Sequence, residues 1–205
     1  MNADQVRAGV DALAAIEPAF AAALARVGSP GPRLRERGYA TLLRTIVGQQ
    51  VSVKAADAVW RKLEALLGDL TDPATVARAT DEQLREAGLS RQKAGYARSL
   101  AEEVTSGRLP LHALPTDDEE AIGALVRVKG IGRWSAEIYL LFAEGRPDIW
   151  PAGDLAVQIE VGRLLGHETR PTEKEVRALA EAWRPHRGAA AIFAWHHYNS
   201  DMAVI

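Results

Sequence analysis

The chain contains no cysteine. This absence excludes disulfides, zinc sites built on thiolates and iron–sulfur clusters. Histidine is another common metal ligand, but the five histidines show no zinc spacing. They are His112, His167, His186, His196 and His197, and the adjacent last two would point to different sides of a helix. We therefore expect chemistry that requires no metal or other cofactor.

Long hydrophobic runs are also missing. No apolar run approaches the roughly 20 residues that span a bilayer, and the N-terminus lacks a basic segment followed by an apolar core. With 205 residues and 47% hydrophobic content, the chain can form one globular unit or two small helical lobes that share a cleft. We expect a soluble cytoplasmic protein, associated with the nucleoid if its source is bacterial.

An excess of basic residues is the third absence. The chain has 25 Lys and Arg against 27 Asp and Glu, a net charge of -2. This balance argues mildly against nucleic acid, because many DNA-binding proteins carry a basic excess. The distribution of charge can override the sum, since acidic residues gather at 117–120 whereas Arg127, Lys129 and Arg133 surround a glycine-containing turn.

No segment shows the strict alternation of a half-buried strand, so we predict an all-α protein of roughly ten helices. Helical spacing and capping residues place helices at about 4–16, 18–27, 38–48, 52–67, 73–79, 81–87, 91–104, 116–126, 132–143, 154–166, 172–183 and 187–199. Thr116 with Glu119, and Thr172 with Glu175, have the spacing of capping boxes.

Gly130 and Gly132 bracket one apolar residue between two amphipathic segments. This pattern is typical of a tight turn between two helices, where the backbone takes a positive φ or approaches something closely. The second helix would begin near Gly132, with the unpartnered amides of its first turn beside Lys129 and Arg133. That arrangement predicts an anion site suited to phosphate.

A second interhelix turn carries two successive glutamines, Gln49 and Gln50, before the N-cap candidate Ser52. Glutamine amides both donate and accept hydrogen bonds, which suits contact with base edges or filling a gap in a base stack. A solvated polar turn is an equally good interpretation. A third helix is expected to start at Ser90, with Arg91 and Lys93 in its first turn. Cations at this end oppose the helix dipole, so either a bound phosphate or ordinary solvation is needed to explain them.

Five stretches carry a resemblance to a known family. They are Gly48-Gln-Gln-Val-Ser52, Gly88-Leu-Ser90 with Lys93-Ala94, Val128-Lys-Gly-Ile-Gly-Arg-Trp134, Asp148-Ile-Trp-Pro-Ala-Gly-Asp154 and Trp183-Arg-Pro-His-Arg187, within about residues 35–200. Together they resemble the hairpin, Gly/Pro-rich loop and aspartate of the helix-hairpin-helix DNA glycosylase superfamily. Within it the chain is similar to the 3-methyladenine DNA glycosylase II (AlkA/Mag type) enzymes. Many non-enzymatic modules use the hairpin alone, but the aspartate 22 residues after Gly132 makes the match strong.

The resemblance implies a two-lobed helical fold with an interlobe cleft. Residues of about 38–115 would form the central lobe, and about 1–37 with 116–205 the lobe that carries the hairpin and the catalytic loop. The chain lacks room for the extra N-terminal β-domain of longer bacterial members. The implied partner is double-stranded DNA containing alkylated bases, bound by a monomer through Gln49, Gln50, Ser52, Arg91, Lys93, Lys129, Gly130, Gly132 and Arg133.

The same resemblance implies that Asp154 is the catalytic residue. Breaking an N-glycosidic bond builds positive charge on the sugar, which a fixed carboxylate stabilises while it positions or deprotonates the attacking water. From spacing alone Asp154 is an N-cap, and the two roles can coexist. Gln50 would occupy the wedge position, which fills the space left by the flipped base. A longer bacterial relative has an apolar residue there.

Relatives that also cut the strand carry a lysine where this chain has Trp134. We therefore expect a monofunctional glycosylase of base excision repair that releases 3-methyladenine and 7-methylguanine and leaves an abasic site, without lyase activity. Such bases are cationic and attracted to aromatic faces. Trp134 and Trp195 are candidate pocket walls, with Trp150 and Tyr39 as further candidates, and a core position is the alternative for all four.

The family's hairpins often bind a monovalent cation through backbone carbonyls, here those of Val126, Val128 and Ile131, so Na⁺ or K⁺ is a possible structural ion. Arg187 is interpreted as structural. Three other functions stay open: a non-catalytic hairpin module that only binds DNA, a glycosylase of the same fold for uracil, hypoxanthine or ethenoadenine, and a helical scaffold unrelated to DNA. A carboxylate such as Asp154 argues against the first of these.

Overall fold

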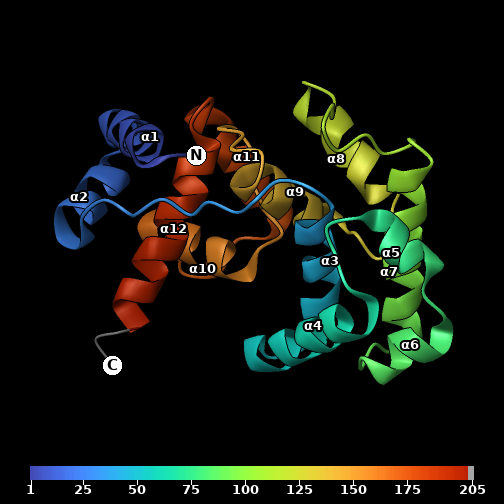
Figure 1. Ribbon diagram of the computed structural model, residues 1–205. Helices are drawn as coiled ribbons and strands as arrows, with labels where there is room; N and C mark the ends of the chain where they lie inside the picture. Colours follow the sequence, from blue (N-terminus) through green and yellow to red (C-terminus); the bar gives the residue numbers. More distant parts are fainter. Residues whose placement is uncertain (203–205) are drawn as a thin grey trace. The chain divides into compact units, whose positions relative to one another are not determined.

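A computed structural model describes residues 1–202, with side chains through residue 200. Within that range helices are the only regular secondary structure and no strand forms, which confirms the all-α prediction (Figure 1). The helices are α1 (Ala3–Ile16), α2 (Pro18–Val27), α3 (Tyr39–Gly48), α4 (Val53–Leu67), α5 (Pro73–Arg78), α6 (Asp81–Glu86), α7 (Arg91–Thr105), α8 (Asp118–Val126), α9 (Arg133–Phe142), α10 (Leu155–Leu164), α11 (Glu173–Leu179), η1 (Ala180–Trp183) and α12 (Arg187–Met202). None of the described helices has the length and apolar character needed to cross a membrane.

Several helix starts follow the capping chemistry of the sequence, whereas α3 starts after Gly38 without a side-chain cap and α8 uses another residue than expected. Thr172 and Glu175 form the expected capping box of α11. At α8 the cap is Asp117 rather than Thr116, and its carboxylate accepts a hydrogen bond from the Glu120 amide at 2.9 Å. The expected partner of Thr116, Glu119, instead pairs with Arg133. The N-cap of α8 is therefore one residue later than the sequence predicted, and Glu119 takes part in a tertiary ion pair.

Two compact units make up the chain. The terminal unit comprises Met1–Leu34 with the chain from Leu140 onward, and the central unit comprises Arg35–Tyr139. The second boundary falls within α9, whereas the sequence suggested a division near residue 115. Residues 116–139 belong to the central unit because the hairpin packs on α7, where the Lys129 amide donates to the Ser99 hydroxyl at 3.1 Å.

In the terminal unit, α1, α2 and α10 pack against α12 (Figure 1). The Phe20 ring lies edge-on to Trp183, with ring centroids 5.1 Å apart, and also contacts Phe193. Gly9 lets α1 approach α12, because a Cβ built there would lie 2.5 Å from the Cβ of Ala189. These contacts form the core of the terminal unit, and α10 packs against it.

A buried polar chain also crosses this unit. Arg26 of α2 contacts Nε2 of His197, and Nδ1 of His197 contacts the carboxylate of Glu160 on α10. Because a guanidinium only donates, Nε2 must accept and Nδ1 must carry the proton that is donated to Glu160. Glu160 is fully buried, and Arg163 lies 3.6 Å from its second oxygen. This series of polar contacts therefore fixes α10 against α2 and α12.

We predict that Glu160→Ala lowers the free energy of unfolding by about 3 kcal/mol, because the buried N–H of His197 loses its charged acceptor. Urea denaturation of the variant beside Glu168→Ala, an exposed control in the same unit, measures this. A loss below about 1 kcal/mol for Glu160→Ala would contradict the assigned role, since ordinary surface substitutions stay within about 0.5 kcal/mol.

Candidate functional site

The hairpin of the central unit has the backbone geometry that the sequence predicts. Gly130 has a φ of +87°, and the Gly132 carbonyl accepts the amide of Ala136 at 3.0 Å, so α9 starts at the second glycine. Within residues 1–202 the amides of Gly130 and Gly132 have no hydrogen-bond partner, and the exposed Lys129 makes no ion pair. Two amide donors beside an ammonium group form a suitable phosphate site.

Arg133 does not join that group of donors. Its guanidinium pairs with Glu119 and, at 2.9 Å, with Glu137. The hydrogen bond that Arg133 donates to Glu119 is the largest cause of the raised pKa of Arg133, and the charge of Glu137 adds to it. The structure thus commits this expected phosphate ligand to two carboxylates. The spacing of Arg133 and Glu137 on one helical face could have indicated half of this arrangement.

Lys93 also differs from its expected role. Its ammonium group donates to the carbonyl of Val47 at 2.8 Å, in the last turn of α3, and burial lowers its pKa. It therefore caps the C-terminus of a helix, where a cation favours the dipole. Arg91 is exposed at the start of α7 and has no partner in the part of the chain that the structure describes. Of the two expected phosphate contacts, only Arg91 is available.

The turn at residues 48–51, which we call the glutamine turn, joins α3 to α4. Gln50 is the one non-glycine residue among those described with a positive φ, at +54°. Such a conformation costs on the order of 1 kcal/mol and tends to persist where function requires it. Ser52 caps α4 by accepting the Ala55 amide at 3.2 Å. Its hydroxyl is therefore already occupied in this structure.

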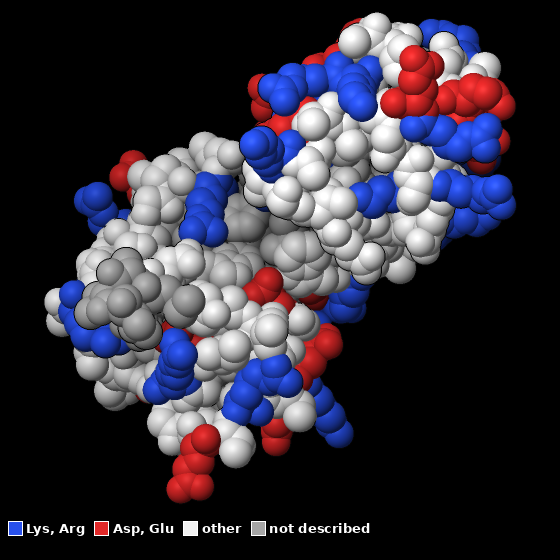
Figure 2. Space-filling view, turned by 90° about the horizontal axis from the view of Figure 1, so that it is seen from below, with Lys and Arg blue, Asp and Glu red and all other residues white. Residues whose placement is uncertain are grey.

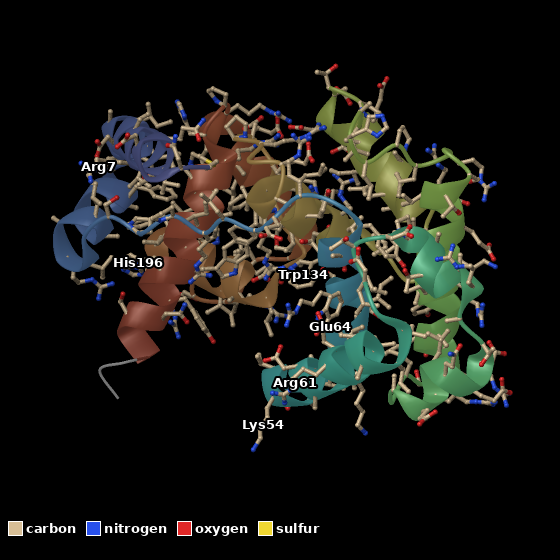
Figure 3. The ribbon with its side chains drawn as sticks, in the orientation of Figure 1. Arg7, Lys54, Arg61, Glu64, Trp134 and His196 are labelled. Atoms are coloured by element: carbon tan, nitrogen blue, oxygen red, sulfur yellow. The ribbon has the colours of Figure 1, made fainter. Side chains whose placement is uncertain are left out.

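Sequence reasoning did not identify the exposed side chains that follow this turn. Val53 is 79% exposed at the first position of α4. Lys54 extends from the same helical turn into solvent (Figure 3) and has no ion-pair partner among the described residues. A hydrophobic side chain and a cation beside the glutamine turn would suit a DNA surface, but neither belongs to a recognisable motif. The face visible in Figure 2 carries both signs of charge, so no single basic field marks that face.

A hollow of about 940 Å³ opens in the central unit between α3, the glutamine turn and the start of α9. Its lining includes Arg35, Glu36, Thr41, Arg44, Thr45, Gly48, Gln49, Gln50, Trp134, Ser135 and Ile138. Trp134, labelled in Figure 3, is 45% exposed and offers an aromatic wall. Arg44, another residue of this lining, forms an ion pair with Asp57 at 3.0 Å and lies over the ring of Trp60. The α3 residues of this lining carry no sequence signal.

Asp154, in the terminal unit, caps the N-terminus of α10. Its Oδ1 accepts the Val157 amide at 3.0 Å and the indole N–H of Trp195 at 3.1 Å. The Trp195 ring is 9% exposed and packs against Phe142, with centroids 5.5 Å apart. The carboxylate is half-buried and is oriented by two donors from different helices. Such a fixed negative group can stabilise a developing positive charge.

The other two aromatic candidates take the core position that the sequence left open as the alternative. Trp150 is 3% exposed, donates its indole N–H to the Val176 carbonyl and packs edge-on against Trp183. Tyr39 is 5% exposed, and burial is the main cause of its raised pKa, with a smaller contribution from Asp72. Tyr39 borders a separate hollow of about 520 Å³ in the central unit. Trp134 lines the hollow beside the glutamine turn, and Trp195 contacts the carboxylate of Asp154.

The loop that leads to Asp154 is held by hydrogen bonds from the start of α12. Arg187 binds both oxygens of Asp148 at 2.9 Å, and the Gly188 amide donates to the Pro147 carbonyl at 2.8 Å. Farther along, the Gln158 side chain donates to the Ala152 carbonyl at 2.8 Å. Arg187 thereby has the structural role that the sequence suggested. These hydrogen bonds fix the backbone of an irregular loop where it enters α10.

The carbonyls of Val126, Val128 and Ile131 lie at the end of α8 and in the hairpin. The Val128 carbonyl already accepts the Ile131 amide at 3.0 Å, and a carbonyl oxygen has a second lone pair. The donor set is neutral oxygen, which fits a monovalent cation. No cluster of three acidic or histidine side chains suited to a metal occurs among the described residues.

Comparison with known proteins places this geometry in context. The family model described as "HhH-GPD superfamily base excision DNA repair protein" matches residues 43–185. The chain is 32% identical over 165 residues to DNA-3-methyladenine glycosylase 1 of Schizosaccharomyces pombe, covering 78% of this chain and 72% of that protein. The crystal structure of a DNA-3-methyladenine glycosidase from Bacillus halodurans matches with a TM-score of 0.84 at 30% identity, covering 93% of this chain and 88% of that one. The Schizosaccharomyces pombe 3-methyladenine DNA glycosylase Mag1, solved in complex with abasic DNA, matches with a TM-score of 0.77 at 28% identity, covering 95% and 96%.

Proposed function

Because the chain belongs to the HhH-GPD superfamily of base excision DNA repair proteins, we propose that it is a DNA glycosylase that releases alkylated bases from duplex DNA. The substrate class is 3-methyladenine and 7-methylguanine, in line with the names of its relatives. The observation that carries the proposal is the carboxylate of Asp154, held by the Val157 amide and the Trp195 indole. Capping of α10 requires only the bond from the Val157 amide, so the second donor, the Trp195 indole, favours a catalytic carboxylate over a plain helix cap.

In the proposed reaction the C1′–N bond breaks and its electron pair leaves with the base. An alkylated base carries a positive charge, so it departs as a neutral molecule. The sugar becomes positively charged, and Asp154 stabilises that charge more in the transition state than in the ground state. The carboxylate then takes a proton from the water whose oxygen forms the new bond to C1′. The products are a free base and an abasic site.

The reaction is proposed to stop at hydrolysis. A lyase needs an amine that attacks the sugar carbon, and the residue after Gly132 and Arg133 is Trp134. Its ring, exposed in the hollow of the central unit, is suited instead to contact with a cationic base. The charged groups of that hollow, Arg35, Glu36 and Arg44, would help to decide which base is accepted.

The test of this function is incubation with an end-labelled duplex that contains one 7-methylguanine. We expect strand breaks only after alkali treatment, and no covalent adduct with borohydride. Breaks without alkali would contradict the monofunctional assignment. Parallel duplexes with uracil, hypoxanthine or ethenoadenine test the main alternative, a glycosylase for another lesion. Binding to every duplex without release of any base would favour the non-catalytic hairpin module.

DNA is proposed to bind through Lys129 and the free amides of Gly130 and Gly132, with Arg91 as a further phosphate contact. Na⁺ or K⁺ held by the carbonyls of Val126, Val128 and Ile131 would bridge the hairpin to the same phosphate. The ion would supply charge for binding and takes no part in bond breaking.

The different positions of Arg91 and Lys93 predict different salt effects. Arg91→Met should reduce the slope of log K against log salt by about 0.9, the loss of one phosphate contact. Lys93→Met should leave that slope unchanged and lower the free energy of unfolding by about 1 kcal/mol, because it removes a helix cap. Fluorescence anisotropy of a labelled duplex at several salt concentrations measures both. An equal fall in slope for Lys93→Met would show that it contacts phosphate after all.

A further inference from the structure

The glutamine turn and the hairpin are joined by one side chain. Gln49 donates from Nε2 to the carbonyl of Gly130 at 2.8 Å, across 81 positions of sequence and within the central unit. The donor is partly buried, so its bond competes less with water than an exposed one would. The contact links the tip of the proposed phosphate site to the turn that carries Gln50.

The acceptor of this bond is held in a fixed place. Gly130 lies against Tyr96 of α7 so closely that a Cβ at this position would be 2.2 Å from the Tyr96 ring. The preceding amide, that of Lys129, donates to Ser99 of the same helix at 3.1 Å. The hairpin tip therefore cannot shift along α7 without losing both contacts.

The donor side is anchored to the same helix. Lys93 of α7 binds the Val47 carbonyl, immediately before the glutamine turn. Lys93, Tyr96 and Ser99 follow one another at three-residue spacing, so they lie on one face of α7. The first holds the end of α3, and the other two hold the hairpin. The hydrogen bond from Gln49 adds a direct link between the glutamine turn and the hairpin, which α7 already holds on either side.

We propose that Gln49 is a positioning residue that makes the hairpin and the glutamine turn one rigid element. The hairpin grips a phosphate, and Gln50 with Val51 enters the space left by the extruded base. Unstacking a base costs a few kcal/mol, so the entering residues must stand at a fixed distance from the phosphate grip. This inference rests on the proposed function, and it adds how binding at the hairpin is converted into base extrusion.

The unusual backbone of Gln50 supports the same assignment. A non-glycine residue at a φ of +54° persists only when its surroundings over-determine it. On one side of Gln50 the Gln49 side chain is fixed to the hairpin, and on the other Ser52 caps α4. Without the Gln49 bond, the turn can relax to a conformation that no longer presents Gln50 and Val51 in the productive place.

Gln49→Met is the sharpest test, because methionine has a similar length, no charge and no N–H donor. We expect the Kd for undamaged duplex to stay within twofold of the parent, since the hairpin grip is intact. We expect the single-turnover rate of 7-methylguanine release to fall about 10-fold, the equivalent of one hydrogen bond of about 1.4 kcal/mol. Gln49→Glu retains the shape without the donor and should lose at least as much.

A readout that needs no chemistry separates this inference from the proposed function. The probe is a duplex with 2-aminopurine beside a tetrahydrofuran abasic analogue, whose fluorescence rises when the base stack is opened. Gln49→Met should give a smaller rise than the parent at saturating protein. The matched control is Gln92→Met, an exposed glutamine of α7 bonded to the Tyr96 hydroxyl, which should retain the parent's rise, rate and Kd.

Two results would overturn the inference. One is a parental fluorescence rise and release rate for Gln49→Met. The other is a Kd that weakens in step with the rate, which would make Gln49 an ordinary DNA contact. If the parent protein opens the stack yet releases no base, the proposed function fails, while the fluorescence comparison still decides the role of Gln49.

Discussion

Asp154→Asn is expected to lower the single-turnover rate of base release by about 10³-fold. Asparagine has the same size, and its side-chain oxygen can still accept the Val157 amide and the Trp195 indole N–H that the carboxylate accepts. The fold of the loop and the N-cap of α10 should therefore remain. What disappears is the negative charge that stabilises the sugar and takes the proton from water. Rates with protein in excess over a duplex containing one 7-methylguanine measure the effect.

The control for this variant is Asp72→Asn, another aspartate that caps a helix, where it accepts the Ala74 amide at 2.8 Å. It should have the parental rate. Both variants should retain the parental Kd for a duplex with an abasic analogue and melt within a few degrees of the parent. A rate for Asp154→Asn within threefold of the parent would mean that Asp154 is a helix cap and nothing more.

Trp195→Phe is the second substitution with a large expected effect. The phenyl ring still packs near Phe142, but the N–H that donates to Asp154 at 3.1 Å is lost. A hydrogen bond to a charged group contributes about 1.5–3 kcal/mol, so the release rate should fall by about 10- to 100-fold through misorientation of the carboxylate. The melting temperature should change by only a few degrees, because the ring remains buried.

Trp183→Phe is the comparison for Trp195→Phe. Its ring packs on Phe20 and Trp150 in the core of the terminal unit, so it should lower stability while the rate of the folded protein stays near the parent's. If the two variants lose rate and stability in the same proportion, Trp195 acts through packing alone. If Trp195→Phe retains the full rate, the indole donor has no role in catalysis.

Features that depend on local chemistry could be predicted from the sequence. Helical periodicity and caps such as Ser52 and Thr172 act within a few residues of each other, so they located the helices well. The two glycines of the hairpin and the N-cap position of Asp154 were visible for the same reason. The family resemblance then supplied what spacing alone left open, namely that a capping aspartate is also the proposed catalyst.

Features that depend on distant partners could not be predicted. Lys93 binds a carbonyl 46 positions away, and Arg133 meets Glu119 across the hairpin. A cation in a first helical turn suggests a phosphate ligand. For Lys93 no local partner points to another role, and for Arg133 the local spacing indicates Glu137 but not Glu119. Trp150 had two interpretations, pocket wall or core, and its N–H donates to the Val176 carbonyl, 26 positions away. In each case a tertiary contact decides between two roles that look alike in the sequence.

The bond between Gln49 and Gly130 belongs to the same class. Each residue stood in a recognisable turn, and both turns were assigned to DNA. The hydrogen bond between the glutamine turn and the hairpin could be recognised only in the structure, where both turns pack on α7. The sequence therefore indicated the parts of the site, whereas the structure supplies the connection between them.

The most direct test of the central claim is chromatography of the bases released from methylated duplex DNA by the parent protein and by Asp154→Asn. We predict that the parent releases free 3-methyladenine and 7-methylguanine, with the strands intact until alkali is added, and that the variant binds the same DNA but releases almost none. Binding by the parent without release of any base would contradict the claim, and would leave the hairpin as a device for holding DNA.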